Sequence, residues 1–333
     1  MSLSNADLIK NTLFSKLGSE QSQSDELEDR WLELEEIVGI DLLDSFLSHH
    51  RTSLIAAKAR GSLHEEYRSI IGEFVGGPFP FLDQVIRSAK NFMRIWDCDF
   101  QDAASVRPLN ALWRVSYDEW IPPLLGYLNQ PVPGLTEAEF LGLLERITMQ
   151  NWVRRLGRTA RLTVYFKLIS AIRAKKVAEE VNAIFIAHAN NDEFINLLGG
   201  EVYGKPFDAA VLLRLEEASQ DDSVTKTYSG RLTIEHILPQ ALKDAYWTDR
   251  FSAETHGLWL HRLGNLAMLC GSKNYKAQYF DFDRKKKIYL DRDKKVSFDL
   301  TKEICTLSEW SEEALKARQE RLIVLAQTMW SIG

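Results

Sequence analysis

The sequence predicts a mainly α-helical protein that carries a small unit of two strands and a helix near its C-terminal end. Apolar residues recur at three- and four-residue spacing through much of residues 26–222, which is the pattern of amphipathic helices. Residues 225–234 are instead rich in Thr, Tyr and β-branched side chains, and residues 258–270 form a second strand-like stretch. A helix-compatible segment, residues 273–287, comes after the second stretch.

Composition identifies an ordinary globular chain. Of its 333 residues, 45% are hydrophobic and 26% are charged, which argues against disorder. No apolar run approaches the roughly 18 residues that span a bilayer, and the N-terminus lacks the apolar core of a signal peptide. The three cysteines lie far apart, without a CxxC pair. We therefore expect a cytoplasmic protein with no membrane partner.

N-cap residues and helix-breaking stretches divide the helical part of the sequence into separate helices. Ser4 is the expected N-cap of a first short helix, with Asp7 at its third position, and residues 19–25 are polar and predict a loop. Thr136 to Glu139 resembles a second capping box. The other expected helices lie within residues 26–60, 81–96, 136–149, 158–173, 175–188, 207–219 and 311–330.

Charge is distributed unevenly along the chain. The whole chain carries a net charge of −6, but the segment from Lys226 to Lys295 carries +6 and the remainder −12. A basic segment in an acidic protein is expected where only that segment meets a polyanion. A solvated helix face is the ordinary explanation of any single lysine run.

One constellation of residues suggests catalysis. Glu235 and His236 stand side by side before Ile237-Leu238-Pro239, and the turn residues Gly264-Asn265-Leu266 come about thirty residues later. Asn274 and Lys276 come next, and then the basic run Arg284 to Lys287. Each piece has a plainer explanation: a buried structural histidine, a turn, or a polar residue at a helix N-terminus. The hypothesis rests on their occurrence together and in this order.

This order resembles the HNH (His-Me finger, ββα-metal) nuclease motif. More narrowly, EHILPQ followed by GNLAML resembles the C-terminal domain of GmrSD-type modification-dependent (type IV) restriction endonucleases, and SNADLIKNTLF resembles the end of their ParB-like N-terminal domain. The resemblance implies a metal-dependent DNA endonuclease in restriction and phage defence, acting on modified foreign DNA and lacking most of its ParB-like regulatory domain. The predicted domains are a tail and linker over residues 1–25, a helical domain over 26–222, an HNH-like nuclease domain over 223–295, and a C-terminal helix over 296–333 that packs on the body.

The resemblance also assigns roles to residues. His236 would be the general base, since a neutral imidazole can take a proton from water near pH 7. Asn265 would orient the imidazole, while Glu235 and Asn274 would supply oxygen ligands to Mg²⁺ or Mn²⁺. The expected phosphate contacts are Lys276, Arg284, Lys285, Lys286 and Lys287. His256 and His261 lie near the motif. A role for His261 in the site is an open alternative, and a structural or surface role is favoured.

Two other classes of function stay open from the sequence. One is a catalytically inactive DNA-binding or assembly module with an HNH-like fold, and the other is a structural helical protein in which EHILP is an accidental match. The sequence leaves open the recognised DNA, single- or double-strand cleavage, nucleotide dependence, the role of the helical middle, and whether the chain is a homo-oligomer. It also leaves open whether the chain cuts DNA alone.

Overall fold

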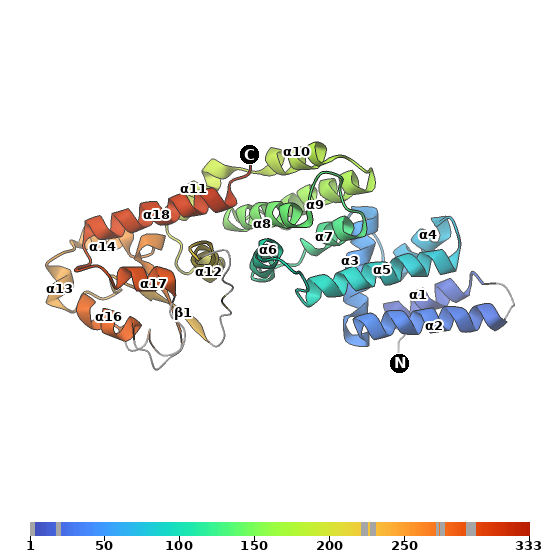
Figure 1. Cartoon of the computed structure of the whole chain (residues 1–333), viewed down its shortest axis with the longest axis horizontal. Helices are drawn as coiled ribbons and strands as arrows, with labels where there is room; N and C mark the ends of the chain where they lie inside the picture. The colour runs from blue at the N-terminus through green and yellow to red at the C-terminus, as the bar shows by residue number, and fades with distance from the viewer. Residues whose placement is uncertain are drawn as a thin grey trace. The chain divides into compact units, whose positions relative to one another are not determined.

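The fold was analysed in a computed structural model, which describes residues 4–17, 21–220, 226, 231–270, 273, 277–290 and 298–333. The described chain is mainly helical, as predicted, and its strands form one two-stranded sheet (Figure 1). Within these residues, every helix is too short or too polar to cross a bilayer. The first helices are α1 (Asn5–Phe14), α2 (Gln21–Val38), α3 (Ile40–Ile55), α4 (Leu63–Glu73), α5 (Pro78–Trp96), α6 (Ala103–Trp113), α7 (Ile121–Asn129), α8 (Glu137–Val153), α9 (Arg158–Arg173) and α10 (Ala178–His188).

The remaining elements contain the candidate site. They are α11 (Asn191–Gly199), α12 (Asp208–Ala218), β1 (Leu232–His236), α13 (Ala245–Thr248), α14 (Ala253–Trp259), the 3₁₀ turn η1 (Leu263–Asn265), β2 (Leu266–Cys270), α16 (Phe282–Tyr289), α17 (Asp299–Ile304) and α18 (Glu312–Trp330).

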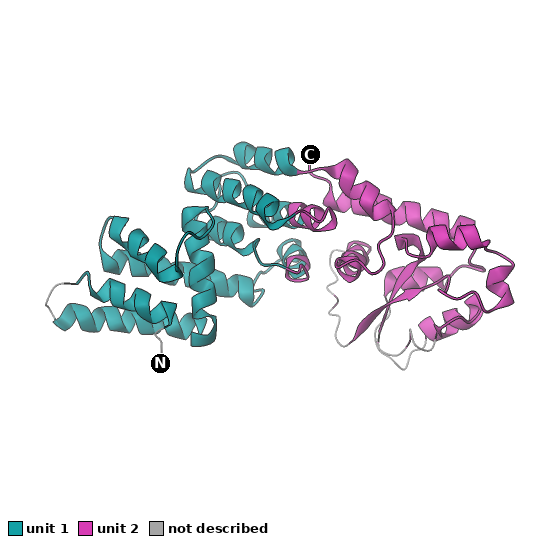
Figure 2. Ribbon diagram, turned by 180° about the vertical axis from the view of Figure 1, so that it is seen from behind, with its two compact units in different colours: residues 1–110, 117–145, 157–188 teal, residues 111–116, 146–156, 189–333 magenta. Residues whose placement is uncertain are grey.

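Contacts within the chain divide it into two compact units (Figure 2). Unit 1 comprises residues 1–110, 117–145 and 157–188 and is entirely helical where it is described. Unit 2 comprises residues 111–116, 146–156 and 189–333 and contains both strands. The domain boundaries expected from the sequence stay predictions.

Both predicted capping boxes are present. The Ser4 hydroxyl accepts a hydrogen bond from the backbone N–H of Asp7, whose carboxylate accepts one from the backbone N–H of Ser4. Thr136 and Glu139 make the same reciprocal pair. These contacts satisfy N–H groups that the first turn of a helix leaves without partners. The helical pattern over residues 26–60 is divided at Gly39, whose φ of 78° breaks the chain between α2 and α3.

The two strands are antiparallel and shorter than predicted. Leu232 pairs with Cys270, and His236 pairs with Leu266. Part of the first predicted strand, residues 225 and 227–230, lies outside the described residues. The second predicted strand, residues 258–270, was wrong at its start, because Leu258 and Trp259 belong to α14, and its strand structure begins only at Leu266, after the turn η1. The N-cap of α14, Ser252, accepts a hydrogen bond from the N–H of Thr255, and this local signal overrides the apolar character of residues 258–260.

A further helix, α17, follows in the chain after Leu290. The backbone N–H groups of Asp299 and Leu300, in its first turn, donate to the carboxylate of Glu216 at 2.6 and 2.9 Å. A carboxylate at a helix N-terminus satisfies N–H groups there and stabilises the helix dipole. The partner comes from α12, more than eighty residues earlier, and so gives no local sequence signal.

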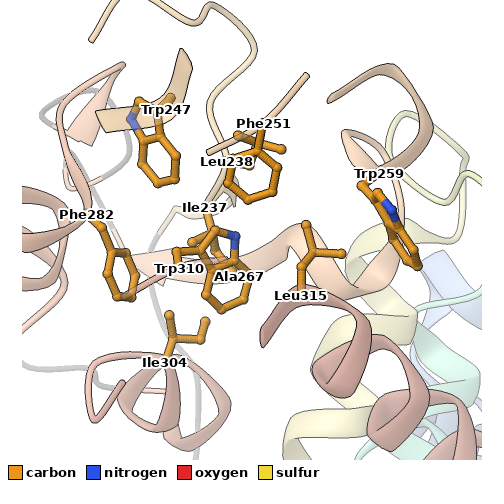
Figure 3. Packing of buried hydrophobic residues seen from close by; sticks show 10 residues of the cluster. All are labelled: Ile237, Leu238, Trp247, Phe251, Trp259, Ala267, Phe282, Ile304, Trp310 and Leu315. Atoms are coloured by element: carbon orange, nitrogen blue, oxygen red, sulfur yellow. The ribbon is translucent and has the colours of Figure 1, made fainter. Parts of the chain in front are cut away.

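A buried apolar cluster lies directly behind the end of β1. Ile237 and Leu238, the two residues after His236, are fully buried in it (Figure 3). The other members are Trp247, Phe251, Trp259, Ala267, Phe282, Ile304, Trp310 and Leu315, from the connection between the strands and from β2, α16, α17 and α18 and their flanks. Burial of two consecutive apolar side chains anchors the backbone immediately after His236.

Candidate active site

His236 ends β1 and is the centre of the candidate site. Its side chain is buried, with 5% of the residue exposed. Its Nε2 lies 3.2 Å from Nδ1 of His261, and its Nδ1 lies 3.2 Å from Nε2 of Gln240. Burial, the largest cause, and the nearby His261, Lys285 and His256 together lower the pKa of His236 to about 3. The imidazole is therefore neutral near pH 7.

Two aromatic rings pack on this imidazole. The ring of Tyr203 meets His236 edge-on, with centroids 4.2 Å apart and planes at 67°. Tyr203 stacks on His261 at 5.4 Å and 11°, and His261 is itself edge-on to His236 at 5.3 Å. The three rings therefore form one cluster, whose members come from three separate parts of unit 2.

Glu235 lies on the opposite face of the strand, as the alternation of side chains along an extended chain requires. Its Oε1 lies 2.6 Å from Nζ of Lys285 and accepts a hydrogen bond from the Tyr289 hydroxyl at 3.2 Å. Lys285 is 0% exposed and also donates to the backbone carbonyl of His236 at 2.7 Å. Burial raises the pKa of Glu235, while Lys285 opposes that rise. Through Lys285, α16 thus holds both Glu235 and the backbone of His236.

Asn265 ties the turn after β1 to the turn before β2. Its Oδ1 accepts from the N–H of Leu238 at 2.7 Å, and its Nδ2 donates to the carbonyls of Leu238 and Leu260, both at 2.9 Å. Its own carbonyl accepts from the N–H of Ile237. Its predicted role in orienting the imidazole of His236 stays a prediction. Its carboxamide is hydrogen-bonded to backbone on either side of the site, so it fixes the chain that carries His236.

Helix α18 holds the same turn from behind. The backbone N–H of Gly264 donates to Oε1 of Gln319 at 2.6 Å, and Arg318 donates to the carbonyls of Leu263 and Gly264 at 3.0 and 2.8 Å. A side chain at position 264 would place its Cβ 2.9 Å from the carbonyl oxygen of Leu315, so only glycine permits this approach. Burial lowers the pKa of the Arg318 guanidinium to about 10.

The predicted basic run does not act as one surface. Arg284 and Lys287 are exposed, whereas Lys286 pairs with Asp283 at 2.9 Å and donates to the carbonyl of Leu307. Lys285 was expected at a phosphate, but the structure places it in the interior against Glu235. Its position three residues after a buried Phe282 turns it toward the core side of α16.

The predicted metal site is only partly visible. Asn274 and Lys276 lie outside the described residues. Among those that are described, no group of three or more His, Cys, Asp or Glu side chains could hold a metal ion. Of the two predicted ligands, Glu235 has its Oε1 engaged by both Lys285 and Tyr289. Because Asn274, the second predicted ligand, lies outside the described residues, the magnesium site stays a prediction.

Sequence reasoning missed one member of the ring cluster, Tyr203, and did not favour a site role for the other, His261. Tyr203 stands more than thirty residues before His236, in the part assigned to the helical domain, and nothing nearby distinguishes it from a packing tyrosine. His261 is close to the motif in the sequence, where a structural or surface role is favoured. A third histidine near the motif, His256, lies against the backbone, with Nε2 2.9 Å from the carbonyl of Pro239, so its favoured structural role agrees with its position.

The fold and the site together define a small helical domain with a two-stranded sheet, built around a buried neutral histidine at a strand end. Residues 188–325 match the family model described as GmrSD restriction endonucleases, C-terminal domain. This match confirms the resemblance drawn from EHILPQ and GNLAML. No curated protein matches the chain. The matched segment includes Tyr203 and every other residue of the ring cluster.

Proposed function

We propose that residues 188–325 cleave phosphodiester bonds in DNA by an HNH-type mechanism, as the nuclease part of a restriction and phage-defence protein. The family match supports nuclease activity in general. The observation that carries the mechanism is the state of His236, a buried and neutral imidazole contacted at both ring nitrogens. A neutral imidazole held in one orientation is what a general base requires.

The chemistry assigned to this site is proton transfer from water. Hydrolysis of a phosphodiester requires an attacking water to lose a proton, and the unprotonated imidazole of His236 is the group assigned to accept it. Asn265 and Lys285 fix the backbone around this residue from two sides. Mg²⁺ or Mn²⁺ remains the predicted cofactor, and we derive no step through it because Asn274, one of its two predicted ligands, lies outside the described residues.

DNA contact is assigned to exposed cations of the same unit. Arg284 stacks on the ring of Phe280, with its guanidinium carbon 3.4 Å from the centroid, and keeps an exposed position. Lys287 is exposed on the same helix, α16. Such side chains position a phosphate backbone without reading its sequence. Modified foreign DNA as substrate and a ParB-like domain as regulatory partner also belong to this proposal.

One observation favours the alternative of an inactive DNA-binding or assembly module. In the family motif the acidic residue before the histidine supplies a metal ligand, whereas Glu235 here is buried against Lys285. If this pair persists with DNA bound, cleavage would be lost while the exposed cations still bound phosphates.

A plasmid-nicking assay with the full chain separates the two functions. The nuclease proposal predicts conversion of supercoiled to open-circular or linear DNA in Mg²⁺ or Mn²⁺, suppression by EDTA, and loss in His236→Ala. His64→Ala, at a partly exposed histidine in unit 1, is the matched control and should cut normally. DNA binding at low salt without cutting would support the inactive module, and cutting that persists in EDTA would overturn the predicted cofactor.

A further inference from the structure

The two nitrogens of His236 face groups of different character. Nε2 of Gln240, at 3.2 Å from Nδ1 of His236, belongs to an amide NH₂ and can only donate. Nδ1 of His236 is therefore the acceptor, and because a neutral imidazole carries one proton, that proton lies on Nε2. From there it points at Nδ1 of His261, 3.2 Å away, which must be unprotonated to accept it.

We propose that His261 is a positioning residue for His236: its Nδ1 accepts the Nε2–H of His236 and thereby leaves Nδ1 of His236 as the nitrogen that accepts a proton. The catalytic meaning of this inference rests on the proposed nuclease function, whereas the hydrogen bond itself does not. The arrangement follows the general rule that a catalytic imidazole is held in one tautomer by an acceptor on its far nitrogen.

His261 is itself held firmly enough to serve this role. Its carbonyl oxygen accepts hydrogen bonds from the backbone N–H groups of Val202 and Tyr203, at 2.8 and 3.1 Å. Glu201 and Arg262 form an isolated antiparallel bridge beside these bonds. The same short segment presents the ring of Tyr203, which stacks on His261 and meets His236 edge-on. One backbone contact thus fixes the acceptor and the ring that packs on both imidazoles.

The geometry also defines the side from which a water would approach. Nδ1 of His236 faces Gln240, which lies just after the buried residues 237–239 and is exposed. Rotation of an exposed amide side chain frees the nitrogen without disturbing the core. The Nε2 side is closed, because the ring of His261 occupies it and Tyr203 packs against both rings.

Two substitutions separate the hydrogen bond from the ring stacking. His261→Phe keeps a flat ring against Tyr203 but removes the acceptor. His261→Asn removes the ring, yet its Oδ1 can stand close to the position of the imidazole Nδ1 and accept the same proton. A merely structural role for His261 predicts that Phe, which retains the packing, is the milder change. The positioning role predicts the opposite order.

The first measurement is the tautomer of His236, by ¹⁵N NMR of full-length protein labelled at histidine and assigned with His236→Gln. We expect the Nε2–H tautomer in the wild type and in His261→Asn, and a mixture of tautomers in His261→Phe. An Nδ1–H tautomer in the wild type, or an unchanged Nε2–H tautomer in His261→Phe, would overturn the proposal. This readout needs no DNA cleavage, so it stands even where the nuclease proposal fails.

The second measurement is the single-turnover nicking rate of the same proteins. His261→Phe should be slowed by about 10- to 100-fold, the usual size of losing an orienting partner, and His261→Asn should recover most of that rate. Thermal melting of each variant shows that it is folded. A folded His261→Phe that cuts at the wild-type rate would contradict the positioning role, whereas a wild type that does not cut would contradict only the proposed function.

Discussion

The ammonium group of Lys285 lies 2.6 Å from the carboxylate of Glu235, and both side chains are buried in unit 2. The pair turns the acidic residue of the EH motif away from the ring cluster and ties α16 to β1. Lys285 also donates to the carbonyl of His236, so the pair acts on the backbone of the proposed base.

Breaking this pair should destabilise unit 2 strongly. Lys285→Met leaves the Glu235 carboxylate buried without its cation, which typically costs about 3–5 kcal/mol in free energy of unfolding. The double variant Lys285→Met with Glu235→Gln removes both charges and should recover part of that loss. Urea denaturation measures both. Lys316→Met breaks an exposed pair with Glu312 on α18 and should leave the free energy of unfolding nearly unchanged. Equal costs for Lys285→Met and Lys316→Met would show that the pair is not buried in solution.

Gly264 should tolerate no side chain. In Gly264→Ala the new Cβ would stand 2.9 Å from the Leu315 carbonyl oxygen and from Cβ of Gln319, so α18 or the turn must move. We expect a loss of about 1–3 kcal/mol, the usual cost of overpacking, seen as a lower Tm. The control is Gly257→Ala in α14, where a Cβ meets nothing within 4 Å and alanine favours the helix. A Gly264→Ala protein as stable as Gly257→Ala would refute the close approach.

The stability of unit 2 should depend on both the amide NH₂ and the amide oxygen of the Asn265 side chain. Asn265→Ala removes the partner of one backbone N–H and two backbone carbonyls. The two groups of Leu238 are buried, and a buried group left unpaired costs about 1–3 kcal/mol. Asn265→Asp keeps the acceptor for Leu238 N–H but directs a carboxylate at the carbonyls of Leu238 and Leu260. We expect it to be about as unstable as the alanine variant in urea denaturation. An aspartate variant near wild-type stability would mean that the two donated bonds contribute little.

Unit 1 contains a histidine that should make stability depend on pH. The Tyr67 hydroxyl donates to the carbonyl of Leu47, so His50 donates from Nδ1 to Tyr67 and keeps an unprotonated Nε2 with no partner among the described residues. Burial lowers the pKa of His50 from 6.5 to about 4. Between these values the unfolded chain binds more protons than the folded one, so stability falls as pH decreases through this window.

A substitution at position 50 tests whether His50 causes this dependence of stability on pH. We expect His50→Gln to reduce the slope of unfolding free energy against pH between about 6.5 and 4 by up to about 1.4 kcal/mol per pH unit. Urea denaturation at several pH values measures it. His64→Gln, at a partly exposed histidine on α4, should leave the slope unchanged. The same slope in His50→Gln and in the wild type would contradict a neutral buried His50.

Local signals explain which parts of the fold were predictable. Ser4 with Asp7 and Thr136 with Glu139 begin their helices where the sequence indicates, because both partners of a capping box lie three residues apart. The last helix, α18, lies within one residue of its predicted start and at its predicted end. The turn at Asn265 was also recognisable, since its residue types are typical of turns.

The remaining features depend on contacts between distant segments. Lys285 belongs to a basic run that resembles a solvated face, and only the packing of α16 against β1 turns it inward. Tyr203 reaches His236 through backbone bonds between its own segment and His261. No spacing or composition in the sequence encodes these approaches, so sequence reasoning placed His236 correctly at a strand end and still missed the ring of Tyr203 beside it.

The most direct test of His236 as the general base is the single-turnover rate at which saturating full-length protein nicks supercoiled DNA in Mg²⁺ or Mn²⁺, compared between the wild type and a folded His236→Ala. We predict a rate lowered by about 10²- to 10⁴-fold, the contribution expected of a general base, with DNA affinity unchanged. Equal rates in the two proteins would contradict the assignment of His236 and, with it, the proposed mechanism.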